Sequence, residues 1–168
     1  MLYYDRQTET FWSGLTGGAV VGPLTGSQLK WVDSEVASWK QWRKSHPKTT
    51  VLKPPRPIGA YRGDPYSRYR EVDRIIFPTG PHPIDKRYPP KSSCTIVLRK
   101  GKARCYPHAA LKEGRNRDGE LTIVKQGENV RVLDAEGKAV ASMFAYWFAW
   151  CAFYPKGTVY SPPSKASR

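Results

Sequence analysis

The sequence predicts an α+β domain, mainly of antiparallel strands, in which two related β-meander-plus-helix units are joined by a long proline-rich basic connection. Short apolar runs separated by turn residues, two Trp-x-x-Trp segments and a concentration of prolines between them lead to this prediction. A single domain is expected at 1–160, with unit one at 1–52, the connection at 53–93 and unit two at 94–160, before a flexible tail at 161–168. The length of 168 residues is typical of one domain.

The first unit is expected to open with a β-meander, because short apolar stretches alternate with polar and glycine-containing turns. The three predicted strands are Leu2–Tyr4, Thr10–Trp12 and Ala19–Val21. A helix is expected after Ser34, a favourable N-cap followed by Glu35 in the first turn. It should end near His46-Pro47, because the residue before a proline disfavours helical backbone.

Prolines dominate the connection between the units. Nine of the chain's 15 prolines lie at 53–93, which excludes a central strand or a long helix there. The connection also carries four tyrosines, Tyr61, Tyr66, Tyr69 and Tyr88. These side chains predict that the segment lies against the body of the protein, as a long ordered connection with a basic surface.

The second unit is expected to begin with a hairpin, Cys94–Leu98 and Ala103–Tyr106, followed by a short helix near 107–111. A second meander is predicted with strands at 121–124, 130–133 and 138–141. The apolar stretch Met143–Phe153 predicts a buried final helix that stops at Tyr154-Pro155. Its eleven residues are too few to cross a bilayer, so no transmembrane segment is predicted.

Two segments of the chain match at a constant offset of 108 residues. Both read Trp-x-x-Trp, four residues, Pro-Lys, one residue, Thr-Val. Two tryptophans three positions apart lie on one helix face, and the proline then ends the helix. The favoured interpretation is an interior anchor used twice, and the alternative is a pair of aromatic platforms for a ligand. The predicted structural anchors are Trp39, Trp42, Pro47, Trp147, Trp150 and Pro155.

The positive charge is concentrated in two stretches. The chain has 28 Lys and Arg against 14 Asp and Glu, a formal charge of +14. Residues 40–70 hold nine basic side chains and one acid, and residues 86–104 hold seven and none. Such a field favours an anionic partner, such as nucleic acid, an acidic protein surface or phospholipid head groups, although basic loops of a soluble protein are the simpler interpretation. The candidate binding residues are Asp5, Arg6, Arg56, Arg62, Tyr66, Arg68 and Arg70.

No catalytic motif is recognisable, so no catalytic residue is predicted and the cofactor is left unknown. Cys94, Cys105 and Cys151 are too widely spaced for a zinc-binding pattern. Cys105 and His108 are three residues apart and could form a thiolate–imidazole pair or two ligands of a soft metal. For Asp5 and Arg6, an ion pair within a turn is the alternative to a polar site.

Several ordered motifs along the chain resemble one family. They are Leu2–Ser13, Leu15–Gly17, Gly22–Leu24, Trp39-x-x-Trp42 with His46-Pro47, Gly63–Tyr66, Lys102–Pro107 and Trp147–Pro155. They are similar to a bacterial family, domain of unknown function 3179, whose members are uncharacterised. The resemblance implies that this chain corresponds to the C-terminal portion of longer proteins, which are exported or lipid-anchored. It therefore suggests an extracytoplasmic location, although no signal-peptide pattern is present here.

The resemblance further implies that the chain is truncated at its start or that a partner supplies missing strands. Cys105 and Cys151 occupy positions where the family pattern leads us to expect alanine, and His108 a position where it leads us to expect an aliphatic residue. These departures weaken the transfer of any site from the family. The strong basic bias, unusual for the family, keeps a specialised partner in view.

Three functional hypotheses follow. The first is a non-enzymatic binding or interaction module, an accessory subunit held to other protein subunits by its basic connection and exposed aromatic side chains. The second is a nucleic-acid-associated protein, in which Lys and Arg contact phosphates and tyrosines stack on bases. The third is an exported redox or metal-binding protein that uses Cys105 and His108. The first is favoured.

Overall fold

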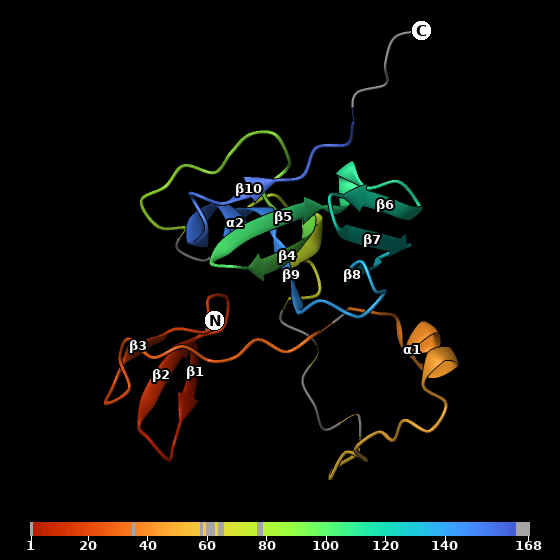
Figure 1. Ribbon diagram of the computed structural model, residues 1–168. Helices are drawn as coiled ribbons and strands as arrows, with labels where there is room; N and C mark the ends of the chain where they lie inside the picture. Colours follow the sequence, from red (N-terminus) through yellow and green to blue (C-terminus); the bar gives the residue numbers. More distant parts are fainter. Residues whose placement is uncertain are drawn as a thin grey trace, which may run out of the picture.

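The computed structural model describes residues 2–34, 36–57, 59, 63, 66–76 and 79–163, and for Arg70 the backbone only. In this part of the chain the structure is rich in strands, mostly antiparallel, with two short α-helices (Figure 1). None of its helices has the length and apolar character needed to cross a bilayer.

The N-terminal meander is confirmed. Strands β1 (Leu2–Asp5), β2 (Thr10–Ser13) and β3 (Ala19–Val21) form an antiparallel sheet in the order β1-β2-β3. Side chains alternate between the faces of a strand, and here one face holds the buried side chains of Thr10, Trp12 and Ala19. The other face remains largely exposed.

A central sheet has the order β10-β5-β4-β9. The predicted hairpin is confirmed as β4 (Ser93–Arg99) and β5 (Lys102–Pro107), with a short 3₁₀ helix, η3 (His108–Ala110), after it. Strand β9 (Ser142–Tyr146) pairs with β4 antiparallel, and β10 (Thr158–Val159) pairs with β5 in parallel.

The third sheet, β6-β7-β8, differs in part from the predicted meander. Strands β7 (Leu121–Gln126) and β8 (Asn129–Leu133) lie where they were expected. The predicted strand at 138–141 contributes only an isolated bridge between Leu133 and Ala139. The third strand is instead β6 (Gly114–Asp118), whose polar sequence carries no apolar alternation.

The final helix is shorter than predicted. Helix α2 begins at Trp147 and ends at Phe153, whereas the start was expected at Met143. The preceding residues form β9, because their pairing satisfies the backbone groups of the buried edge of β4. Tertiary pairing therefore outweighs the local apolar pattern that predicts a helix.

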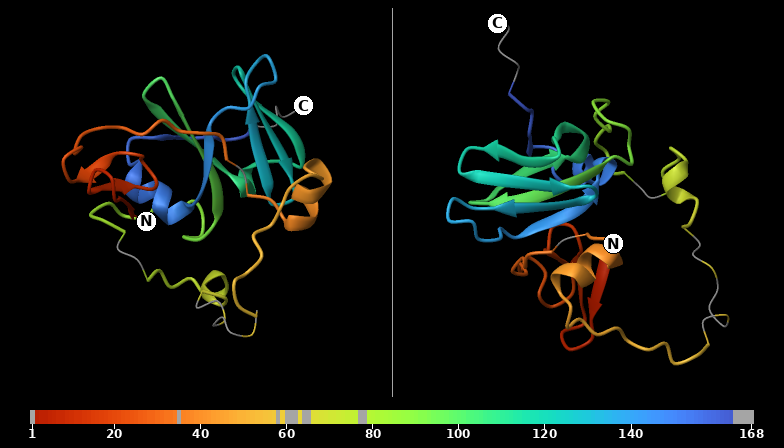
Figure 2. Two further views of the ribbon diagram at one scale, coloured as in Figure 1. Left: turned by 90° about the horizontal axis from the view of Figure 1, so that it is seen from below. Right: turned by 90° about the vertical axis from the view of Figure 1, so that its right-hand side faces the viewer.

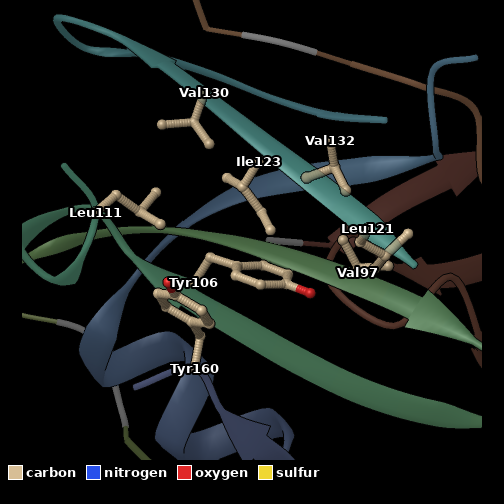
Figure 3. Close-up of a cluster of buried hydrophobic side chains, with 8 residues drawn as sticks. All are labelled: Val97, Tyr106, Leu111, Leu121, Ile123, Val130, Val132 and Tyr160. Carbon is tan, nitrogen blue, oxygen red and sulfur yellow. The ribbon is translucent and has the colours of Figure 1, made fainter. Parts of the chain in front are cut away.

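Two clusters of buried side chains make up the core. One lies between the central and third sheets (Figure 3) and consists of Val97, Tyr106, Leu111, Leu121, Ile123, Val130, Val132 and Tyr160. The other lies beneath α2 and includes Cys94, Ile96, Cys105, Trp147 and Trp150. Leu15 and Trp31 from the N-terminal part of the chain pack against this second cluster.

The first Trp-x-x-Trp helix differs most from its prediction. Helix α1 (Trp39–Ser45) begins after Ser38, not after Ser34, and the Ser38 hydroxyl accepts a hydrogen bond from the backbone N–H of Gln41. No residue of α1 is buried, and Trp39 is 49% exposed, so the expected interior position of Trp39 and Trp42 is wrong. Basic residues occupy much of the helix surface. Trp31, and not Trp39 or Trp42, packs against the buried cluster beneath α2.

The described residues between α1 and β4, which we call the arc, leave the body after the helix in a wide curve and return to it before the strand (Figure 2). The arc includes a 3₁₀ helix, η2 (Tyr69–Glu71). The returning part is anchored, because the indole N–H of Trp147 donates to the carbonyl oxygen of Asp85 at 2.7 Å and the Tyr88 ring lies against the same indole. Tyr66, by contrast, is exposed. Of the predicted tail, residues 161–163 form no helix or strand and 164–168 lie outside the described residues.

Candidate functional site

The predicted polar pair at the N-terminus belongs to a turn. Asp5 ends β1, and its carboxylate accepts hydrogen bonds from the Thr8 hydroxyl at 2.5 Å and from the backbone N–H of Gln7 at 2.9 Å. These hydrogen bonds, that from Thr8 foremost, lower the pKa of Asp5. Arg6 is exposed beside it. The Asp5 carboxylate therefore stabilises the β1–β2 turn.

The candidate residues of the connection are exposed on the arc. Arg56, Tyr66 and Arg68 are all on the surface, and Arg62 and the side chain of Arg70 lie outside the described residues. The arc and the β1–β2 turn lie apart in Figure 1 and in the left-hand view of Figure 2. The structure therefore does not gather Asp5 and Arg6 into one site with these basic residues.

The base of the arc is held by one lysine. The ammonium group of Lys91 donates to the carbonyl oxygens of Tyr69 and Val72. The same group lies 3.5 Å from the centroid of the Tyr69 ring, which is close enough for a cation–π contact. The basic arc is thus tied to the body where it returns toward β4.

Cys105 and His108 lie on opposite faces of the central sheet. Cys105 pairs with Ile96 and faces the cluster beneath α2. His108 contacts Thr95, with its Nε2 2.9 Å from the Thr95 hydroxyl, and Thr95 shares a face with Tyr106. The structure does not bring the thiol and the imidazole together. Within the described residues, no group of three or more His, Cys, Asp or Glu side chains could hold a metal ion.

The three thiols are buried and unbridged. Burial raises the pKa of Cys105 and of Cys151, and in the case of Cys105 the neighbouring thiol of Cys94 adds to the effect. The Cys94 thiol itself donates to the carbonyl oxygen of Ala145 at 3.2 Å. Because the thiolate is the reactive form, buried thiols with a raised pKa are poor nucleophiles and poor metal ligands.

His108 is also buried, and it adjoins a small cavity. Desolvation, with a lesser contribution from the charge of Lys125, lowers the pKa of His108 to about 4. Its Nδ1 has no hydrogen-bond partner among the described residues. The adjoining cavity, lined by Ser34 and Phe144 among others, has a volume of about 10 Å³. That volume is near the lower limit for a single water molecule and excludes an organic ligand.

The exposed face of the N-terminal sheet is apolar. Tyr4 lies opposite Phe11, with ring centroids 4.9 Å apart, and Phe11 lies opposite Val21. Leu2, two residues before Tyr4, shares the face and is 62% exposed, and Val21 is 60% exposed. We call Leu2, Tyr4, Phe11 and Val21 the apolar face. It adjoins the outer edge of β1, which pairs with no other strand in the described residues.

A second surface feature lies on α1. Trp39, Lys40, Arg43 and Lys44 line an open cleft with a volume of about 410 Å³, which we call the α1 cleft. The sequence analysis noted the basic residues of 40–70 but assigned Trp39 to the interior. The signal that points to a surface site is the alternation of cations and indoles over seven residues that lack an acid.

Comparison with family profiles gives one match. The profile described as protein of unknown function (DUF3179) matches residues 1–135, which is most of the chain. The chain belongs to this family. The DUF3179 match spans the N-terminal sheet, α1, the connection and strands β4 to β8, and so includes both the apolar face and the α1 cleft. Comparison with the curated proteins and with the solved structures finds no match.

Proposed function

We propose that this DUF3179 chain is a non-enzymatic interaction module that serves as an accessory subunit of a larger assembly. The observation that carries the proposal is the apolar face beside the outer edge of β1. Soluble monomers rarely expose contiguous apolar patches of large side chains. An open strand edge is, in addition, a template for pairing with a strand of another chain.

One mode of docking uses both features. A partner strand added to β1 would satisfy the outer backbone groups of β1, and the partner's side chains would cover Tyr4 and Phe11. The opposite face of the sheet is already occupied by the protein's own core, through Trp12 and Ala19. The formal charge of +14 opposes close association of two copies and favours a partner with an acidic surface.

The test is purification of the tagged full chain from its native cells, beside two variants. Tyr4→Lys places a charge in the apolar face, and Leu52→Lys makes the same change at an exposed apolar residue of the arc. We expect the wild type and Leu52→Lys to copurify with another protein at constant stoichiometry, and Tyr4→Lys to lose it. Both variants should unfold at the wild-type temperature, because both sites are exposed.

Two results would contradict the proposal. One is recovery of the wild-type chain alone, as a stable and monodisperse monomer. The other is retention of the same partner by Tyr4→Lys, which would place the contact elsewhere on the surface.

A further inference from the structure

Helices α1 and α2 repeat one local structure at the offset of 108 residues. Each has seven residues and begins at the first tryptophan of its Trp-x-x-Trp motif. The capping residues have nearly the same backbone angles, φ −131° and ψ 69° at His46 and φ −131° and ψ 55° at Tyr154. In both, the capping N–H donates to the carbonyl oxygen of the second tryptophan.

The likeness extends to the side chains and to the turn beyond each helix. The Trp42 ring stacks on His46 with ring centroids 3.8 Å apart, and the Trp150 ring stacks on Tyr154 with ring centroids 5.3 Å apart. The backbone N–H of Thr49 donates to His46, and that of Gly157 donates to Tyr154. A proline follows the capping residue in both segments.

Helix α2 is covered by a peptide segment of the same chain. Residues 84–92, an irregular proline-containing stretch, lie against its first turn. The indole N–H of Trp147 donates to Asp85, the Tyr88 ring meets the indole edge-on at 4.9 Å, and the backbone N–H of Phe148 donates to Pro90 at 2.8 Å. The first tryptophan of this motif thus contacts a non-helical segment of the chain.

The corresponding position of α1 is open. Trp39 corresponds to Trp147, but it is half exposed and lines the α1 cleft. The remaining residues of the cleft are cationic where α2 is apolar. Lys40, Arg43 and Lys44 stand in place of Phe148, Cys151 and Ala152. Helix α1 therefore has the local structure of the peptide-covered helix α2, but its surface is basic.

We propose that the α1 cleft binds a non-helical acidic peptide segment of a partner protein, seated on α1 as residues 84–92 are seated on α2. Carboxylates of the segment pair with Lys40, Arg43 and Lys44, and a side chain or the backbone packs against the Trp39 indole. The inference rests on the proposed function as an interaction module and names the chemistry of one partner surface. Charge complementarity supports this occupant, because α1 carries three cations and no acid.

The test measures binding of a fluorescent peptide of alternating Glu and Pro with one Tyr to the full-length chain. The matched probe has Gln in place of each Glu, and oligo(dT) is the nucleic-acid probe. The test variant is Arg43→Gln with Lys44→Gln. The control variant, Lys102→Gln with Lys138→Gln, removes the same charge from exposed lysines outside α1.

We expect the acidic probe to bind, and the Gln probe to bind at least about tenfold more weakly. The test variant should weaken binding of the acidic probe by about tenfold or more, and the control variant by about twofold or less. Trp39→Ala should weaken binding without lowering the unfolding temperature. The proposal is overturned if the two double variants lose affinity equally, or if oligo(dT) binds more tightly than the acidic probe and depends on the same side chains.

A variant of the apolar face distinguishes a failure of this inference from a failure of the proposed function. Tyr4→Lys should bind the acidic probe like the wild type, because Tyr4 is not part of the α1 cleft. If the probe does not bind while Tyr4→Lys still loses its copurified partner, the cleft assignment fails and the interaction module stands. If the probe binds as expected while Tyr4→Lys keeps the partner, the docking surface of the proposed function fails instead.

Discussion

The indole of Trp150 lies directly over Gly157, so that a Cβ atom at Gly157 would stand 2.2 Å from the ring atom Cη2. Glycine is therefore required at this position for steric reasons. In the matching segment after α1, Thr49 occupies the equivalent place, and its hydroxyl accepts a hydrogen bond from the Trp42 indole N–H at 2.9 Å. The buried indole of Trp150 occupies the space that a side chain at position 157 would need. The indole of Trp42 instead forms a hydrogen bond with the side chain at the equivalent position.

Gly157→Ala should lower the free energy of unfolding by about 1–3 kcal/mol, because the added methyl group overpacks the core beneath α2. Urea unfolding followed by tryptophan fluorescence measures the change. Gly63→Ala is the matched control, since no atom of the described residues, the two chain neighbours apart, lies within 4 Å of a Cβ there, and its effect should stay within about 0.5 kcal/mol. Equal effects of the two substitutions would show that the Trp150 contact does not determine the cost.

Asp118 connects two side chains of β5 to β6. Its carboxylate pairs with Arg104 through two hydrogen bonds, one at 2.8 Å from Nη2, and accepts a third at 2.8 Å from the Tyr106 hydroxyl. Asp118→Ala should lower the free energy of unfolding by about 1–3 kcal/mol, because the partly buried donors lose their acceptor. Glu120→Ala, which breaks the exposed pair with Arg99, should cost less than about 1 kcal/mol. A larger loss for Glu120→Ala in the same denaturant series would refute this ranking.

The buried imidazole makes stability depend on pH. The pKa of His108 is lowered to about 4 in the fold, against about 6.5 for an unperturbed histidine. Between these values the unfolded chain binds a proton that the folded chain does not. The contribution of the neutral His108 ring to the free energy of unfolding is therefore complete above about pH 6.5 and is lost as the pH falls toward about 4.

His108→Leu should flatten this part of the pH profile, and unfolding in urea across the window measures it. His82→Gln, at an exposed position, should leave the wild-type slope in place. A profile for His108→Leu as steep as that of the wild type would assign the slope to other groups.

The buried thiols should react slowly in the native protein. Cys94, Cys105 and Cys151 are buried, and burial raises the pKa of Cys105 and Cys151, so a thiol reagent should modify them mainly as the structure opens. Leu52→Cys supplies an exposed thiol that should react at once under the same conditions. Rapid stoichiometric modification of a native thiol in the wild type would restore the hypothesis of a reactive cysteine.

Sequence patterns predicted the strands whose apolar residues face a core. Strands β2, β4, β5, β7 and β8 all carry such residues, and each lies within about two residues of its expected bounds. Strand β6 could not be predicted in this way, because its buried side chain is Asn116. The Asn116 side chain accepts from the backbone N–H of Lys112 and donates to the carbonyl oxygen of Lys112. A strand whose buried side chain is polar has no alternation of apolar residues by which its sequence could predict it.

The candidate site was harder to predict than the fold. The two Trp-x-x-Trp motifs specify the same helix, but burial depends on the residues between the tryptophans and on which segment covers them. Lys40, Arg43 and Lys44 distinguish α1 from α2 and are visible in the sequence. Their meaning depends on residues 84–92, whose contact with α2 only the structure reveals. For Cys105 and His108, close spacing suggested a pair that the sheet places on opposite faces.

The order of the central sheet has a consequence for synthesis of the chain. The hairpin of β4 and β5 leaves the ribosome before its neighbours in the sheet, and its two edges receive β9 and β10 only after the whole third sheet has been made. Tyr160, just beyond β10, then enters the interior. Until β9 and β10 have been made, the hairpin keeps two open edges, so we expect the nascent chain to depend on chaperones until both strands have joined the sheet.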